Sequence, residues 1–206
     1  MSSMKSLLAI AIITLASSFS LNAQEHTPRP PVGTPTPVPR TTPTVPRTTP
    51  PNNVADSSGW VRFTSEAGRF SVLMPELPNA ETPQTTPSEH GPYTTHLFIT
   101  RTPTSVYLIG WVDYDPNFNF NRQQELEANR DNFVKGVQAT LMDSRALTID
   151  GYNAIEFIAE TDTRRFKSRV YMVGRRPYQI VIASQKTEDD PVSTSRFFNS
   201  FKVSPR

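Results

Sequence analysis

The side chains best suited to metal binding or acid–base chemistry lie between residues 90 and 115. Asp113 and Asp115 stand two apart at the end of an apolar run, so their carboxylates would point the same way and could share a hard cation. Calcium sites need about six or more oxygen ligands, and no Asp-x-Asp-x-Asp-Gly loop follows this pair. A strand end with a turn at Asp115-Pro116 explains both carboxylates at least as well. We therefore predict no metal ligand here.

His90 and His96 bracket a loop and are the remaining candidates for a general acid or base. No G-x-S-x-G sequence accompanies them, and no glycine-rich phosphate loop precedes a helix, since Gly174 is followed by Arg-Arg-Pro. A hydrolase that uses carboxylates and one of these histidines is thus the least favoured of three functions. We predict no catalytic residue and no cofactor.

A row of cationic residues is a candidate ligand surface. Arg165, Lys167 and Arg169 alternate with the four residues Phe166, Ser168, Val170 and Met172. Alternation favours a strand with one buried and one solvated face over a ligand surface. Residues 60–206 carry seventeen basic and seventeen acidic residues. This balance gives no charge excess to bind nucleic acid or an anionic membrane.

The aromatic residues near Asn117 offer a candidate partner-binding surface. Phe118 and Phe120 alternate with asparagines just before a helical pattern. They could form an exposed recognition loop, or one ring could pack on the first helical turn as a hydrophobic staple, which we favour. Our hypothesis is that at least one of these rings, together with Tyr93, lines a binding surface.

The elements that position these residues follow from hydrophobic periodicity. Strands are predicted at 60–63, 69–74, 94–100, 106–114, 144–149, 152–160, 164–173 and 178–183. The strand at 106–114 is apolar on both faces, which indicates a central position. Prolines rule out regular structure over 75–92. Two helices are predicted, one over 121–141 and one that starts at Asp190-Pro191.

The helix faces are predicted from the same periodicity. The core-facing residues of the two helices are Leu126, Phe133, Val137 and Leu141 in the first, and Val192, Ser195, Phe198 and Phe201 in the second. Charged residues such as Glu125 are assigned mostly to the other side of the first helix. The sum is an α+β domain with a mostly antiparallel sheet and helices packed on it.

The first 59 residues do not belong to this domain. Residues 1–23 combine Lys5, an apolar run and Ala23 at the cut, as in a secretory signal peptide that is cleaved, with an uncleaved anchor as the alternative. Residues 24–59 contain Val-Pro-Arg-Thr-Thr-Pro twice, and ten of the twenty prolines lie between Pro28 and Pro51. We predict an extended, disordered linker, with a docking site for a proline-binding partner or O-linked glycosylation as alternatives.

The absence of cysteine excludes disulfides and thiolate chemistry. Together with a signal peptide, it favours a periplasmic or extracellular protein of a bacterial envelope. The domain predicted for residues 60–206 then has no membrane span of its own.

Three segments carry a resemblance to a known group. They are Phe63-x-Ser65-x-x-Gly68-Arg69-Phe70-Ser71-Val72-x-Met74-Pro75-x-x-Pro78, then Tyr171-x-Val173-Gly174-Arg175-x-x-Tyr178-Gln179, then Phe197-Phe198-Asn199-Ser200-Phe201. This pattern resembles small exported bacterial proteins with the PsbP-like α/β/α sandwich fold. The resemblance implies a central antiparallel sheet between helical layers and, because characterised relatives are mostly binding proteins and assembly factors, a non-enzymatic role. No functional motif residue carries across.

The sequence therefore favours an exported accessory or binding module that acts on another envelope or extracellular protein. The alternative is a carrier of a small ligand, a lipid or a metabolite, with an apolar pocket between helix and sheet.

Overall fold

The structure is a computed structural model that describes residues 59–118 and 121–204 of the 206-residue chain. The predicted signal peptide, nearly all of the predicted linker, and Phe120 lie outside the described residues. The elements are β1 (Val61–Ser65), β2 (Phe70–Met74), β3 (Asn79–Ala80), β4 (Gln84–Thr86), β5 (Tyr93–Arg101), β6 (Ser105–Tyr114), α1 (Arg122–Gly136), β7 (Thr140–Ile149), β8 (Tyr152–Glu160), β9 (Arg164–Val173), β10 (Arg176–Gln185), α2 (Pro191–Ser200) and β11 (Lys202–Val203). No helix in this part of the chain is long and apolar enough to cross a membrane.

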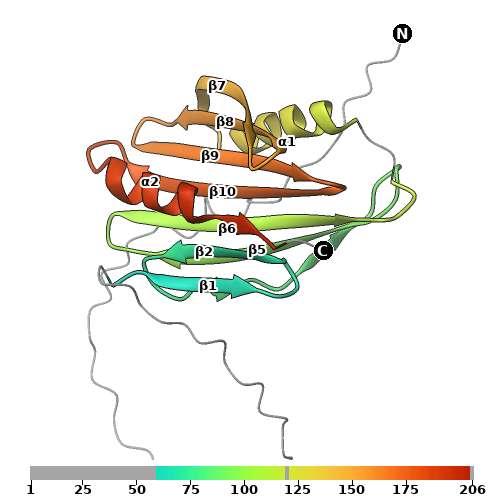
Figure 1. Cartoon of the computed structure of the whole chain (residues 1–206). Helices are drawn as coiled ribbons and strands as arrows, with labels where there is room; N and C mark the ends of the chain where they lie inside the picture. Colours follow the sequence, from blue (N-terminus) through green and yellow to red (C-terminus); the bar gives the residue numbers. More distant parts are fainter. Residues whose placement is uncertain (1–58, 119–120, 205–206) are drawn as a thin grey trace, which may run out of the picture.

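Most strands form one antiparallel sheet, ordered β3-β5-β6-β10-β9-β8-β7, with β4 also paired to β5. Short hairpins connect β5 to β6 and link β7 through β10 into a meander (Figure 1). A second, three-stranded sheet has the order β1-β2-β11. The predicted α+β class with a mostly antiparallel sheet is confirmed.

The large sheet lies between two layers (Figure 1). On one face, Leu126 and Phe133 of α1 pack into a core with Phe157 and Val170. On the other face, α2 and the small sheet together bury a second core around Phe70. The large sheet is therefore covered on both faces, which explains why its central strands are apolar on both sides.

The central position predicted for residues 106–114 is confirmed. In β6, the first eight residues are all buried, and the strand pairs with β5 on one side and β10 on the other. A Cβ at Gly110 would lie 2.8 Å from the backbone oxygen of His96. Glycine is therefore needed where β5 and β6 approach each other.

Helix α1 begins as predicted and ends earlier. The Asn121 side chain accepts hydrogen bonds from the backbone N–H groups of Gln123 and Gln124, which caps the helix. The helix ends at Gly136, and Gln138 has a φ of 53°, which no helix continues. The prediction that Leu141 belongs to the helix is wrong, because Leu141 lies in β7.

Three other predictions need correction. Residues 75–92 contain the short strands β3 and β4, which pair with β5 and form the edge of the sheet, while the prolines stay outside them. In α2, Val192 is 75% exposed, and the buried helix residues are Phe197 and Phe198. Glu125, assigned from the sequence to the polar side of α1, is buried.

Candidate functional site

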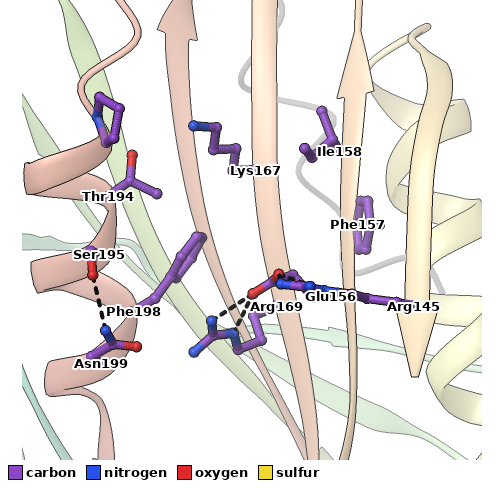
Figure 2. Close-up of a pocket in the computed structure, with 11 residues that line it drawn as sticks. Arg145, Glu156, Phe157, Ile158, Lys167, Arg169, Thr194, Ser195, Phe198 and Asn199 are labelled. Carbon is purple, nitrogen blue, oxygen red and sulfur yellow. Dashed lines mark hydrogen bonds and ion pairs between the residues drawn. The ribbon is translucent and has the colours of Figure 1, made fainter. Parts of the chain in front are cut away.

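An open groove lies between α2 and the strands β8 and β9, with a volume of about 350 Å³ (Figure 2). Its lining residues come from β7, β8, β9 and α2: Arg145, Glu156, Phe157, Ile158, Lys167, Arg169, Pro191, Thr194, Ser195, Phe198 and Asn199. Strand register places the charged members on one face, because β8 pairs Glu156 with Arg169 and β7 pairs Arg145 with Glu156. The groove is thus formed by segments far apart in the sequence.

Helix α2 forms one wall of the groove, and its start is fixed by two residues. The Asp190 carboxylate accepts hydrogen bonds from the backbone N–H groups of Val192 and Ser193, and Pro191 occupies the first helical position. Phe197 and Phe198 are buried against the sheet and hold the helix in place. Thr194 and Ser195 line the groove, where the Thr194 hydroxyl donates to the backbone oxygen of Asp190 at 2.7 Å and the Ser195 hydroxyl accepts from the amide of Asn199 at 3.0 Å.

The floor of the groove carries one carboxylate between two guanidinium groups. The Nε atom of Arg145 donates to Oε1 of Glu156 at 3.0 Å, and Nε of Arg169 donates to Oε2 at 2.8 Å (Figure 2). Burial alone would raise the pKa of Glu156, but the hydrogen bonds from Arg145 and Arg169 outweigh burial and lower the pKa. Glu156 is therefore a fixed anion in the groove.

The charge network continues toward the end of β9. Lys167 Nζ donates to Asp189 at 2.7 Å, and Arg165 bridges Asp189 at 3.1 Å and Glu160 at 2.7 Å. Lys186 Nζ lies 2.8 Å from the second Glu160 oxygen. Hydrogen bonds from Lys167 and Arg165 lower the pKa of Asp189, although burial opposes them. The cations of β9 thus hold acids from two other segments in place, β8 and the loop before α2.

The predicted alternation of buried and outward-facing residues along β9 is confirmed. The prediction that the outward face is solvated needs correction. Phe166, Ser168 and Val170 are buried on the α1 side, as expected. The side chains of Lys167 and Arg169 on the other side are only partly exposed, because α2 lies over them. Arg169 also sits 4.9 Å above the centre of the Phe198 ring, an attractive cation–π distance.

The groove could have been found from the sequence only by combining two signals. Arg165, Lys167 and Arg169 define one face of β9, and Asp190-Pro191 marks the start of a helix. Neither signal says that the helix returns over that face, since this requires the order of the strands. The groove was therefore missed.

The two histidines contact different partners. His96 stacks on Trp111 with ring centres 4.3 Å apart, and its Nε2 lies 3.2 Å from Oδ2 of Asp113. Burial, and to a smaller extent the charge of Arg176, lower the pKa of His96 against the opposing effect of Asp113. His90 instead packs edge-on against Phe118 at 5.8 Å.

The structure separates the roles of Asp113 and Asp115. Asp113 accepts hydrogen bonds from Nε1 of Trp111 at 3.0 Å and Nε of Arg176 at 2.7 Å, so it fastens β6 to β10. Asp115 accepts from the backbone N–H of Asn117 at 2.8 Å, which forms the turn expected there. Over residues 59–118 and 121–204, no group of three or more His, Asp or Glu side chains is placed to hold a metal ion.

Two of the three aromatic residues proposed to line a binding surface lie in the core. Tyr93 is 7% exposed and Phe118 is 6% exposed, and both belong to the core on the α1 side. Phe118 packs on Tyr114, with ring centres 4.6 Å apart. Packing near the start of α1 therefore describes Phe118 better than a docking surface does. Phe120, the third residue of the hypothesis, lies outside the described residues.

Comparisons with known proteins bear on the fold. No protein-family model and no curated protein matches the chain. The chain is similar to the solution structure of cyanobacterial PsbP (CyanoP) from Synechocystis sp. PCC 6803, with 11% identity and a TM-score of 0.45 over 77% of this chain and 98% of that one. It is also similar to a crystal structure from Bacteroides thetaiotaomicron, with 15% identity and a TM-score of 0.36 over 70% and 48% of the two chains. Both similarities concern the fold alone.

Proposed function

We propose that this protein is an exported, non-enzymatic binding module that captures another envelope or extracellular protein in the groove between α2 and β9. The observation that carries the proposal is the composition of that groove. It combines an arginine stacked on a buried phenylalanine, Arg169 on Phe198, with the hydroxyl groups of Thr194 and Ser195. Arginine and aromatic residues are enriched in the parts of interfaces that contribute most to binding.

The rigidity of these side chains supports the same role. Arg169 is held by Glu156 and by the hydroxyl of Tyr171 at 3.3 Å, so its orientation is set before a partner arrives. Such preorganisation reduces the entropy lost on binding. The groove alone is small, so we expect a transient complex rather than an obligate one.

Site-specific photo-crosslinking in the cells that express the protein tests this proposal. A photoreactive residue replaces Thr194 in the groove in one variant and Lys135, an exposed residue of α1, in the control. We expect a discrete protein adduct from position 194 that purified wild-type protein competes away, and no such adduct from position 135. Equal adducts at both positions, or none at position 194, would contradict the proposal.

The carrier function remains a second proposal, supported by the volume of the groove. About 350 Å³ falls at the lower end of the range typical of small-molecule pockets, roughly 300–1,000 Å³. Native mass spectrometry of the protein as purified from its host would favour this function if it showed one stoichiometric small molecule that an Arg169→Ala variant lacks.

A further inference from the structure

The turn over residues 66–69, between β1 and β2, is fastened to the large sheet by two side chains of β10. Nη1 of Arg176 donates to the backbone oxygen of Ala67 at 3.0 Å. The hydroxyl of Tyr178 donates to the backbone oxygen of Gly68 at 2.8 Å. The two sheets are therefore joined at this end by side-chain hydrogen bonds, in addition to the apolar core that lies between them.

Asp113 orients Arg176, and its carboxylate faces three polar groups. Nε of Arg176 donates to Oδ1 at 2.7 Å, Nε1 of Trp111 donates to Oδ2 at 3.0 Å, and Nε2 of His96 lies 3.2 Å from the same Oδ2. The ring of His96 is stacked on that of Trp111, with 3° between the two planes. We call these four residues the His96 cluster. His96 is thus connected to the turn through one carboxylate and one arginine.

The charges that face His96 come from two neighbouring strands, Asp113 from β6 and Arg176 from β10. Other charged side chains of the adjoining segments make no ion pair with the cluster in the described part of the chain: Glu66, Arg69 and Glu81. With a neutral imidazole, one carboxylate balances one guanidinium. With a protonated imidazole, two cations would share that carboxylate.

This arrangement disfavours the protonated form of His96. Burial has the largest effect in lowering the pKa of His96, Asp113 opposes it, and the charge of Arg176 adds to it. Because the folded pKa of this base is lowered, its contribution to stability is present above the unfolded pKa of about 6.5 and is lost as the pH falls through the folded pKa. Acid therefore favours any opening that returns the ring of His96 to water.

We propose that His96 is a pH-sensitive switch, whose protonation in mild acid separates Arg176 from Asp113 and releases the turn over residues 66–69. This inference goes beyond the proposed function and does not depend on the groove. An opening confined to the turn breaks a few hydrogen bonds and exposes little apolar surface, so it requires far less free energy than unfolding of the domain. The two cores beside the large sheet stay packed.

Proton–nitrogen correlation NMR of the full chain between pH 7.5 and pH 5 tests the inference. We expect the ring of His96 to titrate with a midpoint below its ordinary value of about 6.5. The backbone amides of Ala67 and Gly68 and the indole N–H of Trp111 should shift with the same midpoint. Hydrogen exchange of the turn amides, corrected for its intrinsic pH dependence, should become severalfold faster as His96 is protonated.

A matched pair of variants assigns the response. His96→Gln removes the titrating ring and keeps an N–H donor for Asp113, so the pH response of the turn should disappear. His90→Gln is the control, because the ring of His90 packs against Phe118 and not against the His96 cluster, and the response should be unchanged. Local signals are used because protonation of Glu125 affects the whole fold with the opposite sign.

Three results would overturn the inference. A His96 midpoint above about 6.5 would mean that the imidazolium strengthens the contacts of Asp113. A ring that titrates while the turn amides do not respond would mean that the proton is accommodated without release of the turn. A turn response that persists in His96→Gln would come from another group. The first two results need only the wild-type protein, so they decide the question even if His96→Gln does not fold.

Discussion

The large sheet has a fully buried glutamate on one face and a partly buried one on the other, and the two faces treat its charge in opposite ways. On the α1 side, Glu125 is 2% exposed and accepts hydrogen bonds from the hydroxyl of Tyr114 at 2.6 Å and the amide of Asn129 at 2.9 Å. On the α2 side, Glu156 accepts from two guanidinium groups. Neutral donors cannot offset burial, so the pKa of Glu125 is raised, whereas arginines lower that of Glu156.

This difference separates a sealed face from a face that can bind. Around Glu125 the contacts are apolar or neutral, and the core on that side is closed by α1. Around Glu156 the side chains are ionised and border an open groove. A carboxylate that stays charged keeps its arginines fixed in position, which a recognition site needs. A carboxylate that favours its neutral form fixes no cation, and its only requirement is that it packs well in the core.

Removing a large ring from each face should show the largest effect. Phe133 packs edge-on against Phe157 and Phe166, at 5.6 and 5.7 Å between ring centres, inside the sealed core. We expect Phe133→Ala to lower the free energy of unfolding by close to 5 kcal/mol, the upper end of the usual ~3–5 kcal/mol for such a change. Phe198→Ala should cost closer to 3 kcal/mol, because water from the groove can enter the space. Urea unfolding measures both, and equal losses would mean that the two faces are equally closed.

Neutralising the groove carboxylate should have the next largest effect. Glu156→Gln removes charge-assisted hydrogen bonds from Arg145 and Arg169, and we expect a loss of about 2 kcal/mol at pH 7. Because the folded pKa of Glu156 is lowered, its contribution is present above the unfolded pKa and is lost as the pH falls through the folded pKa. The difference in stability between wild type and the variant should therefore become smaller in acid. Thermal unfolding at pH 7 and pH 3 checks this, and a difference that becomes larger in acid would rule out the ion pairs as its cause.

The sequence allowed the elements of this fold to be predicted where a local signal fixes them. Asn121 caps α1, Asp190-Pro191 starts α2, and the apolar run of β6 is central. These features depend on residues within a few positions of each other, so a pattern reveals them. Leu141 fits the helical spacing of apolar residues, but it lies in β7, beyond the end of α1. The helix ends because Gln138 has a positive φ, which the sequence pattern does not reveal.

The candidate site could not be predicted in the same way, because it depends on strand register. Arg145 and Glu156 meet across β7 and β8, and Glu156 meets Arg169 across β8 and β9. A shift of one residue in either pairing would turn these side chains to opposite faces. Tyr93 and Phe118 show the converse, since aromatic residues in a loop-rich segment resemble a recognition surface until their burial is known.

Glu125 gives the smallest effect, with the opposite sign to that of Glu156. Because its folded pKa is raised, its protonated form stabilises the fold below the unfolded pKa, and this contribution is lost as the pH rises through the folded pKa. Glu125→Gln keeps the shape and an acceptor for Tyr114 and removes the charge. We expect the variant to be about 1 kcal/mol more stable than wild type at pH 8 and nearly equal at pH 4.

The control for this prediction is Glu127→Gln, an exposed position two residues along α1. It removes the same charge from the same helix without changing the core, so its stability should follow wild type at both pH values. Thermal unfolding of the three proteins at pH 4 and pH 8 gives the comparison. If Glu125→Gln loses stability at pH 8, the carboxylate beneath α1 is held as an anion after all. The contrast between the two faces would then lie in solvent access and not in the charge of their buried carboxylates.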